Sequence, residues 1–361
     1  MLCSPPPRHE IRKIAVLMYG LLGDTLIRTP LLRELRALYC DATIVAFADQ
    51  SGKNALDLTN LIDEVIVLNR RKRRFRLDAL FRIGHFLKLR LGSYDLVIDL
   101  YMGKTSQRMT RYSGARYKIF AGFEQTKSNW VKYPLALSHY NYRNPYHCSN
   151  FCLNALGFLT TGHVNLSTQP ALDLNRLESI SRSKELKKII NTGSFFLVSL
   201  GSGDPRKVPD LATVLAVCGY TSRETGAIPT VIKNPGQEHL QASLVTGLTE
   251  AKIPFQALNE LTLEQISALM LRAKFVILPD SGLFHIATGL GVNILALFTY
   301  TNPELVRPDA DNCTIVFKPD NFCRSRTNNL PFGTGLPSTD TLLSITSRFL
   351  AGSENRGADI A

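Results

Sequence analysis

The sequence repeats one pattern in both of its halves: a short apolar run, followed by a segment in which apolar residues recur at helical spacing. In the first half, apolar runs occupy residues 13–18, 43–47, 65–68 and 96–98, with a helical pattern over residues 30–38. In the second half, strand-like runs at residues 195–200, 229–232, 275–278 and 294–298 alternate with helical patterns at residues 209–218, 238–248, 263–272 and 283–290. Alternation of this kind predicts parallel sheets covered by helices on both faces.

The pattern lapses once, near the middle of the chain. Residues 165–174 include the polar run Ser167, Thr168, Gln169, Pro170, which is typical of a connection between domains. A chain of 361 residues also exceeds what one hydrophobic core usually supports. We therefore predict two Rossmann-like domains, at residues 11–168 and 169–350, and a loose tail over residues 352–361.

Composition excludes several classes of protein. Residues 1–13 lack the apolar core of a signal peptide, and no apolar stretch approaches the ~20 residues that span a bilayer. The seven cysteines are scattered without the spacing of a zinc site or a disulfide scaffold, which favours a reducing compartment. Cys148, Cys152 and Leu156 follow one helix face, and we interpret them as core residues. We predict no metal site and no cofactor.

The net charge of +12 favours an anionic partner. Six basic residues fall within seven positions, namely Arg70, Arg71, Lys72, Arg73, Arg74 and Arg76. Arg82, Lys88 and Arg90 follow among apolar residues at helical spacing, as in a basic amphipathic helix. This segment has four interpretations: a solvated helix face, contact with an anionic membrane, contact with an acidic acceptor, or nucleic acid binding. No recognition module supports the last.

Two loops concentrate residues suited to chemistry. In parallel sheets, ligands bind beyond the carboxyl ends of strands, where helices present free N–H groups. The first such loop, residues 20–25 (GLLGDT), follows the opening strand and carries Asp24 at the mouth of a helix. Asp24 is suited either to cap that helix or to accept a proton from a substrate hydroxyl, and spacing does not decide between these roles. The loop lacks the full glycine pattern of a dinucleotide site.

The second loop, residues 279–282, precedes a helix that carries His285 on its first turn. Ser281 and Gly282 suit backbone and hydroxyl contacts to phosphate oxygens, and His285 can donate to the same anion or cap the helix as a neutral ring. Asp280 is also a candidate N-cap. So many polar groups beside an apolar strand favour a binding site for the phosphates of a substrate.

At these two loops the sequence resembles the heptosyltransferases, the glycosyltransferase family 9 enzymes of the lipopolysaccharide core. The resembling stretches are residues 20–36 (GLLGDTLIRTPLLRELR) and 275–308 (FVILPDSGLFHIATGLGVNILALFTYTNPELVRP). Weaker matches lie at residues 94–100, 118–123, 201–209 and 231–238, so that the resemblance extends over roughly residues 11–350.

The resemblance implies an α/β fold of the GT-B type, with two Rossmann-like domains whose parallel sheets face each other across a cleft. It implies an acceptor-binding N-terminal domain, a donor-binding C-terminal domain, and inverting transfer of heptose from ADP-heptose to a lipopolysaccharide inner-core acceptor without a metal. By position, Asp24 resembles the general base and Lys207 the lysine that neutralises the leaving diphosphate. We predict donor contacts for Asp280, Ser281, Gly282, Leu283, His285, Glu238 and Thr262. We predict acceptor contacts for Gly23 and Thr25 and, because of their charge, for Arg70, Arg71, Arg73 and Arg74.

The chain departs from the family pattern at several positions. Tyr300 stands where a glycine is usual, and Ser199, Leu200 and Val208 replace typical residues of their loop. The register of Lys207 is uncertain by one residue, which leaves Arg206 as an alternative. A related inverting transferase with another nucleotide-sugar donor, or a binding protein without turnover, therefore remains an alternative. We expect a cytoplasmic protein, peripheral at the inner membrane of a Gram-negative bacterium, that does not bind nucleic acid.

Overall fold

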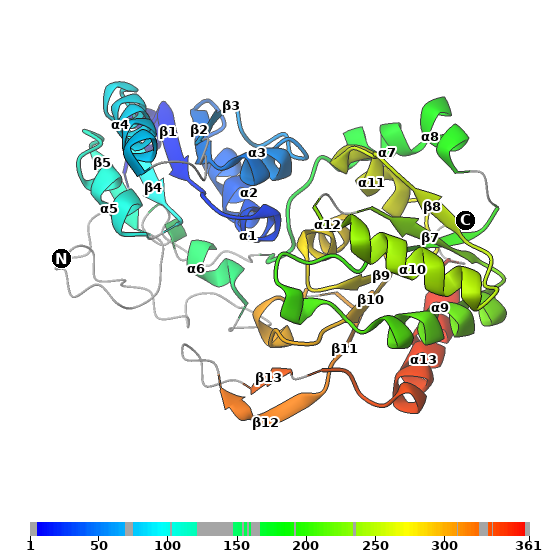
Figure 1. The fold of residues 1–361 in the computed structure, drawn as a ribbon. Coiled ribbons are helices and arrows are strands. Elements are labelled where there is room, and N and C mark those ends of the chain that lie inside the picture. Colours follow the sequence, from blue (N-terminus) through cyan, green and yellow to red (C-terminus); the bar gives the residue numbers. More distant parts are fainter. Residues whose placement is uncertain are drawn as a thin grey trace. The chain divides into compact units, whose positions relative to one another are not determined.

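The computed structural model describes residues 6–68, 75–101, 103–120, 147–153, 155–156, 159, 167–190, 193–233, 236–308, 310–324, 331–333 and 335–357. The chain divides into two compact units, Met1–Leu172 and Asp173–Ala361. Figure 1 shows the first unit in blue to green and the second in green to red.

A five-stranded parallel sheet forms the centre of the first unit. The strands lie in the order β3-β2-β1-β4-β5, and β1 at the centre pairs with β2 and β4 through Ile14, opposite Ile44 and Leu96. The strands are β1 (Lys13–Leu17), β2 (Thr43–Ala48), β3 (Glu64–Val67), β4 (Leu96–Asp99) and β5 (Tyr117–Phe120). The helices are η1 (Arg8–Glu10), α1 (Leu22–Leu26), α2 (Thr29–Leu38), α3 (Gln50–Leu56), α4 (Phe75–Leu91), α5 (Lys104–Arg111) and α6 (Ser149–Leu153).

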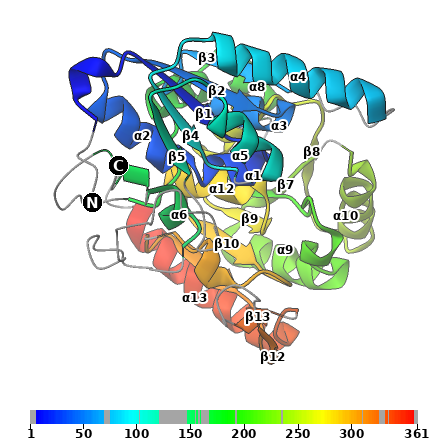
Figure 2. The same ribbon diagram turned by 90° about the vertical axis from the view of Figure 1, so that its left-hand side faces the viewer.

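Alternate residues of β1 point to opposite faces of this sheet, and both faces are buried. Ile14 and Val16 pack in one cluster with the leucines of α2, whereas Leu17 packs in another with Leu89 of α4 and Met109 of α5. Because both faces are covered, β1 is a continuous apolar run, which is why it is recognisable from sequence. Figure 2 shows α4 as a long helix along the outside of this unit.

The second unit is built on a six-stranded parallel sheet in the order β11-β10-β9-β6-β7-β8. Its strands are β6 (Phe195–Val198), β7 (Ile228–Ile232), β8 (Gln256–Leu258), β9 (Val276–Pro279), β10 (Ile294–Leu297) and β11 (Cys313–Val316), and a separate antiparallel pair is formed by β12 (Pro319–Arg324) and β13 (Pro331–Gly333). The helices are α7 (Leu174–Ser181), α8 (Lys184–Ile189), η4 (Pro205–Lys207), α9 (Leu211–Thr225), α10 (Glu238–Glu250), α11 (Leu263–Met270), α12 (Gly282–Leu290), η5 (Pro303–Leu305) and α13 (Thr339–Gly357).

The predicted α/β class, with two parallel-sheet units, is confirmed. The strands that sequence analysis omitted include β5, β8 and β11, which lie at sheet edges, where partial exposure weakens the apolar signal. The prediction of a loose tail from residue 352 was wrong in part, because α13 continues to Gly357. Phe349 and Leu350 anchor that helix in the core, so its polar last turns follow the packed ones.

The described part of the chain contains no helix that is long and apolar enough to cross a membrane. Cys152 and Leu156 are buried in the core of the first unit as predicted, while Cys148 is partly exposed. No group of three or more His, Cys, Asp or Glu side chains among the described residues is placed to hold a metal ion.

Candidate active site

One edge of the second sheet gathers polar side chains from several loops. Strand β9 lies between β6 and β10, and because all three are parallel, the loops after their carboxyl ends meet at the same edge. The loop after β6 carries Ser202 and Lys207, the loop after β9 carries Asp280, and the loop after β10 carries Thr301. Residues that are far apart in the sequence are thereby brought together.

Asp280 is the centre of this group. Its side chain is 6% exposed, and Oδ2 lies 2.6 Å from Lys207 Nζ and accepts a hydrogen bond from Thr301 Oγ1. The Asp280 carbonyl accepts a hydrogen bond of 2.7 Å from Ser202 Oγ. Asp280 is therefore held by both of its neighbouring loops rather than capping α12. Burial of a carboxyl group is costly unless it has polar partners, and here a cation and a hydroxyl donor supply them.

Helix α12 begins directly after this loop. Ser281 is its N-cap residue, yet no side chain caps the helix, and Ser281 Oγ is buried without a hydrogen-bond partner among the described residues. The first N–H groups of a helix have no acceptor within it and attract anions. Gly282 and Leu283 begin the first turn, and His285 is buried at the end of that turn. The combination of an uncapped helix and an unpartnered hydroxyl fits an anionic ligand.

The structure distinguishes Lys207 from Arg206. Arg206 has other partners: its guanidinium binds Asp204 and lies 4.0 Å from the centroid of the Tyr300 ring, with Nη1 donating to the Tyr300 hydroxyl at 2.8 Å. Hydrogen bonds from Arg206 lower the pKa of Asp204 to about 2. Thus Arg206 already has a carboxylate partner, whereas Lys207 is the cation beside Asp280.

Glu238 and Thr262 both lie at helix starts on the same unit. Glu238 Oε1 accepts a hydrogen bond from Gly236 N–H at 3.1 Å, and hydrogen bonds from its own N–H and from Gly236 lower the pKa of the Glu238 carboxyl. Thr262 forms a capping box with Gln265 at the start of α11. Each side chain has a structural role, and their donor contacts stay predictions.

In the first unit, Asp24 lies on α1, beyond the carboxyl end of β1. Its Oδ2 accepts a hydrogen bond of 3.0 Å from Leu21 N–H, so the helix-capping role is present. The side chain is exposed. An exposed carboxylate that makes a single cap contact is also accessible to a substrate hydroxyl, and the two roles are compatible.

The backbone around Asp24 is tightly built. Gly20 has φ of 151°, and a Cβ there would lie 2.9 Å from Asp24 Cβ, so a side chain at this position would displace Asp24. Gly20 N–H donates to Asp49 Oδ2 at 3.0 Å, and Arg28 Nη1 donates to the Tyr19 carbonyl at 2.6 Å. These contacts fix the loop that presents Asp24.

The predicted acceptor residues fall into two groups. Gly23 lies on α1, and Thr25 is fully buried with its hydroxyl donating to the Leu21 carbonyl at 3.1 Å. Arg70, Arg71, Arg73 and Arg74 lie outside the described residues. Acceptor contacts by all six stay predictions.

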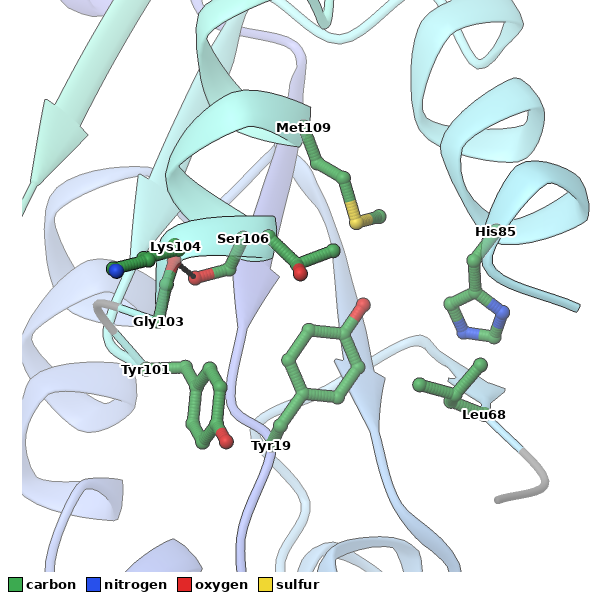
Figure 3. A pocket seen from close by; sticks show the side chains of 9 residues that line it. Tyr19, Leu68, His85, Tyr101, Gly103, Lys104, Ser106 and Met109 are labelled. Atoms are coloured by element: carbon green, nitrogen blue, oxygen red, sulfur yellow. Dashed lines mark hydrogen bonds between the residues drawn. The ribbon is translucent and has the colours of Figure 1, made fainter. Parts of the chain in front are cut away.

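The first unit also contains a pocket of about 190 Å³ that sequence analysis did not anticipate. Its lining residues are Tyr19, Leu68, His85, Tyr101, Gly103, Lys104, Thr105, Ser106 and Met109. Figure 3 shows Tyr19 between the start of α5 and His85, with Tyr101 beside it. The pocket lies where the loops after β1, β3 and β4 meet.

Sequence reasoning missed Ser202 and Thr301, the two hydroxyls that hold Asp280, and Gln237, whose Nε2 donates to the Ser202 carbonyl at 2.5 Å. No local motif marks them. Their common signal is position, since each follows the carboxyl end of a parallel strand, and that signal becomes usable only once strand order is known.

The comparisons with known proteins agree with this arrangement. Residues 222–331 match the model of glycosyltransferase family 9 (heptosyltransferase), a region that includes Glu238, Asp280, His285 and Thr301. No curated protein matches the chain. The matched segment defines the class of the protein as a glycosyltransferase.

Solved structures extend the likeness to almost the whole chain. The glycosyltransferase family 9 protein of Veillonella parvula superposes with a TM-score of 0.69 at 16% identity, covering 94% of this chain and 97% of that chain. The ADP-heptose lps heptosyltransferase II of E. coli gives a TM-score of 0.68 at 16% identity, covering 95% and 99%. E. coli heptosyltransferase WaaC, solved with ADP, gives 0.64 at 16% identity, covering 93% and 99%. The predicted GT-B fold is thereby confirmed, and the match over residues 222–331 is to the family that the sequence resembles.

Proposed function

We propose that the chain transfers heptose from ADP-heptose to a lipopolysaccharide inner-core acceptor, with inversion at the sugar carbon and without a metal ion. The observation that carries the proposal is the Lys207–Asp280 ion pair beside the uncapped start of α12. Two of the solved relatives are named for heptosyl transfer, and one of these was solved with ADP.

Departure of a nucleoside diphosphate places negative charge on the leaving oxygen, and catalysis requires donors aimed at that charge. Lys207, the N–H groups of α12, Ser281 and His285 supply such donors in this proposal. Asp280 orients hydroxyls of the donor sugar, Glu238 holds the ribose, and Thr262 and Leu283 complete the donor contacts. Lys207, which pairs with Asp280, is in this proposal the cation that contacts the diphosphate.

Bond formation also requires removal of a proton from the acceptor hydroxyl. We assign this step to Asp24. Its cap contact uses Oδ2, and the exposed carboxylate accepts the hydroxyl proton as the sugar carbon is attacked. Gly23 and Thr25 shape the loop on the acceptor side, and the arginines Arg70, Arg71, Arg73 and Arg74 attract the acidic acceptor.

A specific observation favours an alternative donor. Tyr300 replaces the glycine expected from the family pattern, and its ring is covered by Arg206. In this proposal the stacked pair, next to Lys207 in the sequence, alters the space available to the donor. An inverting transferase with another nucleotide sugar is therefore the second candidate.

A thermal-shift series with ADP, UDP and GDP separates the candidates, since a ligand that binds only the folded state raises Tm. Stabilisation by ADP alone supports the adenine donor. Equal or greater stabilisation by UDP or GDP contradicts it. Release of ADP from ADP-heptose in the presence of acceptor then tests turnover, and binding without release identifies a protein that has lost catalysis.

We also propose peripheral contact with the anionic inner membrane of a Gram-negative bacterium, on its cytoplasmic side, through α4. Ile83, Leu87 and Leu91 are 53%, 46% and 73% exposed and recur every fourth residue along one face. Residues 70–90 contain nine basic residues and one acid, Asp78. Apolar side chains flanked by positive charge suit insertion into an anionic lipid surface.

Vesicle flotation tests this contact. We expect binding to anionic but not neutral vesicles, with loss of about tenfold or more in the I83S/L87S/L91S variant. Leu174→Ser, a substitution of an exposed leucine of the second unit, is the matched control. Unchanged flotation of the triple variant would contradict the proposed membrane contact. A wild-type dimer that becomes a monomer in the triple variant would also contradict it.

A further inference from the structure

The element that carries Lys207 is too small to fix a side chain by itself. Lys207 is the last residue of η4, a three-residue turn in which Pro205 and Arg206 are exposed and which adds no buried side chain to the core. Short 3₁₀ turns have poor hydrogen-bond geometry and depend on their surroundings for stability. Lys207 Nζ nevertheless lies 2.6 Å from Asp280 Oδ2. Contacts from outside η4 are therefore needed to hold this lysine in place.

The loop after β10 contacts Arg206, the residue directly before Lys207, through both its main chain and its side chain. Thr299 Oγ1 donates to the Arg206 carbonyl at 2.6 Å. The Arg206 guanidinium carbon lies 4.0 Å from the centroid of the Tyr300 ring, well within the range of a cation–π contact, and Nη1 donates to the Tyr300 hydroxyl at 2.8 Å. The position of η4 is thereby tied to the loop after β10.

Asp204 fixes the orientation of the Arg206 side chain. Arg206 Nε donates to Oδ1 at 3.0 Å and Nη2 donates to Oδ2 at 2.6 Å. A pair of parallel contacts of this kind sets the plane of a guanidinium. Asp204 is also the N-cap of η4, since Oδ1 accepts from Arg206 N–H at 3.0 Å. Tyr300 therefore contacts a guanidinium that is already aligned with η4, and movement of one accompanies movement of the other.

The same loop also holds the carboxylate of the ion pair. Thr301, the residue after Tyr300, donates its hydroxyl to Asp280 Oδ2, the atom that Lys207 contacts. Residues 299–301, which we name the clasp, thus contact Asp280 through one residue and the neighbour of Lys207 through the other two. A segment attached to both sides sets the distance between the cation and the carboxylate.

We infer that the clasp holds Lys207 against Asp280, and that Tyr300 is a positioning residue that acts on Lys207 through Arg206. The effect on catalysis rests on the proposed function, in which Lys207 neutralises the leaving diphosphate. Displacement of a catalytic group by about 1 Å can lower a rate by roughly 10²-fold, so partial loss of the clasp should lower kcat measurably.

Tyr300→Ala tests the inference in steady-state measurements of ADP release. We expect kcat to fall about five- to tenfold while donor KM changes by less than about twofold, because Lys207 acts mainly on the charge that develops in the transition state. Tyr300→Phe keeps the ring face and loses the hydroxyl, so kcat should fall only about two- to threefold. Arg206→Gln should match Tyr300→Ala. Arg182→Gln breaks an exposed arginine–glutamate pair of the same unit and should leave kcat unchanged.

The route through Lys207 is tested by combining variants. In a Lys207→Gln background, Tyr300→Ala should lower kcat by less than about twofold, because the side chain that Tyr300 positions is already lost. A further five- to tenfold loss in that background overturns the inference, since Tyr300 would then act by another route.

Amine labelling tests the clasp without turnover. In a time course with an acetylating N-hydroxysulfosuccinimide ester, followed by mass spectrometry, Lys207 of the wild type should react more slowly than Lys252, which is exposed. Tyr300→Ala should accelerate labelling of Lys207 by about threefold or more and leave Lys252 unchanged. Unchanged labelling of Lys207 overturns the inference, and a rise in donor KM would then assign Tyr300 to the donor site. Faster labelling with an unchanged kcat supports the clasp and contradicts the role of Lys207 in transfer, so the two fail separately.

Discussion

The two loops that sequence analysis singled out differ in how they are held. Asp280, in the second unit, is buried and its carboxylate is engaged by Lys207 and Thr301. Asp24, in the first unit, is exposed, and among the described residues its side chain accepts one hydrogen bond, from Leu21 N–H at the start of its own helix. A carboxylate that must orient a donor gains from fixed partners, whereas a proton acceptor must remain accessible. We therefore expect a substitution at Asp24 to lower activity without lowering stability. Substitutions around Asp280 should lower both.

The largest effect should come from Asp24→Asn. The amide oxygen of the substituted side chain still accepts from Leu21 N–H, so the helix cap and Tm are retained, while the proton acceptor is lost. We expect kcat to fall by roughly 10²–10⁴-fold. Measurement of ADP release and thermal melting on the same preparation tests this, with Asp57→Asn, a change to an exposed acid of the same unit, as control. A kcat within about threefold of wild type would restrict Asp24 to helix capping.

Lys207→Gln should give the next largest loss, in activity and in stability together. We expect kcat to fall by roughly 10²–10³-fold through loss of charge at the leaving group. Asp280 is left without its cation, but the cost remains below the ~3–5 kcal/mol of a fully buried pair because the Lys207 side chain is 28% exposed. Arg206→Gln is the comparison. If it reduces kcat more than Lys207→Gln does, the charge role belongs to Arg206.

Thr301→Val sharpens the comparison within the second unit alone. It removes the hydroxyl that donates to Asp280 and leaves the ion pair in place. We expect donor KM to rise by about three- to tenfold with a smaller change in kcat, as for the net loss of one typical hydrogen bond. Thr301→Ser retains the hydroxyl and should behave as wild type. A Ser variant as impaired as the Val variant would assign the effect to packing of the methyl group.

The smallest effect concerns pH and the first unit. Burial lowers the pKa of His85 below its ordinary value of 6.5, so the unfolded chain takes up a proton before the folded chain does. His85 therefore does not lower the free energy of unfolding above pH ~6.5. Below that pH, the free energy of unfolding falls by at most ~1.4 kcal/mol per pH unit. Urea unfolding at pH 7.5, 6.5 and 5.5 should show a shallower fall for His85→Phe. An identical slope in both proteins would show that this ring does not titrate during unfolding.

Much of the fold was predictable because buried parallel strands leave a strong local signal. β1, β2, β6, β9 and β10 are covered on both faces and form continuous apolar runs. Edge strands such as β8 are shorter and partly exposed, and no local pattern separates them from loops. The end of α13 was placed too early because its last turns are polar, so that no apolar pattern marks them as helical.

The sequence alone determined which elements form and which loops carry chemistry, because apolar periodicity and polar residues beside strand ends are local properties of the chain. Tertiary structure decided which of these side chains contact one another. The order β10-β9-β6 brings Thr301 and Lys207 to Asp280, and the meeting of β1, β3 and β4 creates the pocket of His85 and Lys104. Those contacts depend on which strands are neighbours, and strand order arises from the packing of the whole sheet rather than from any short segment.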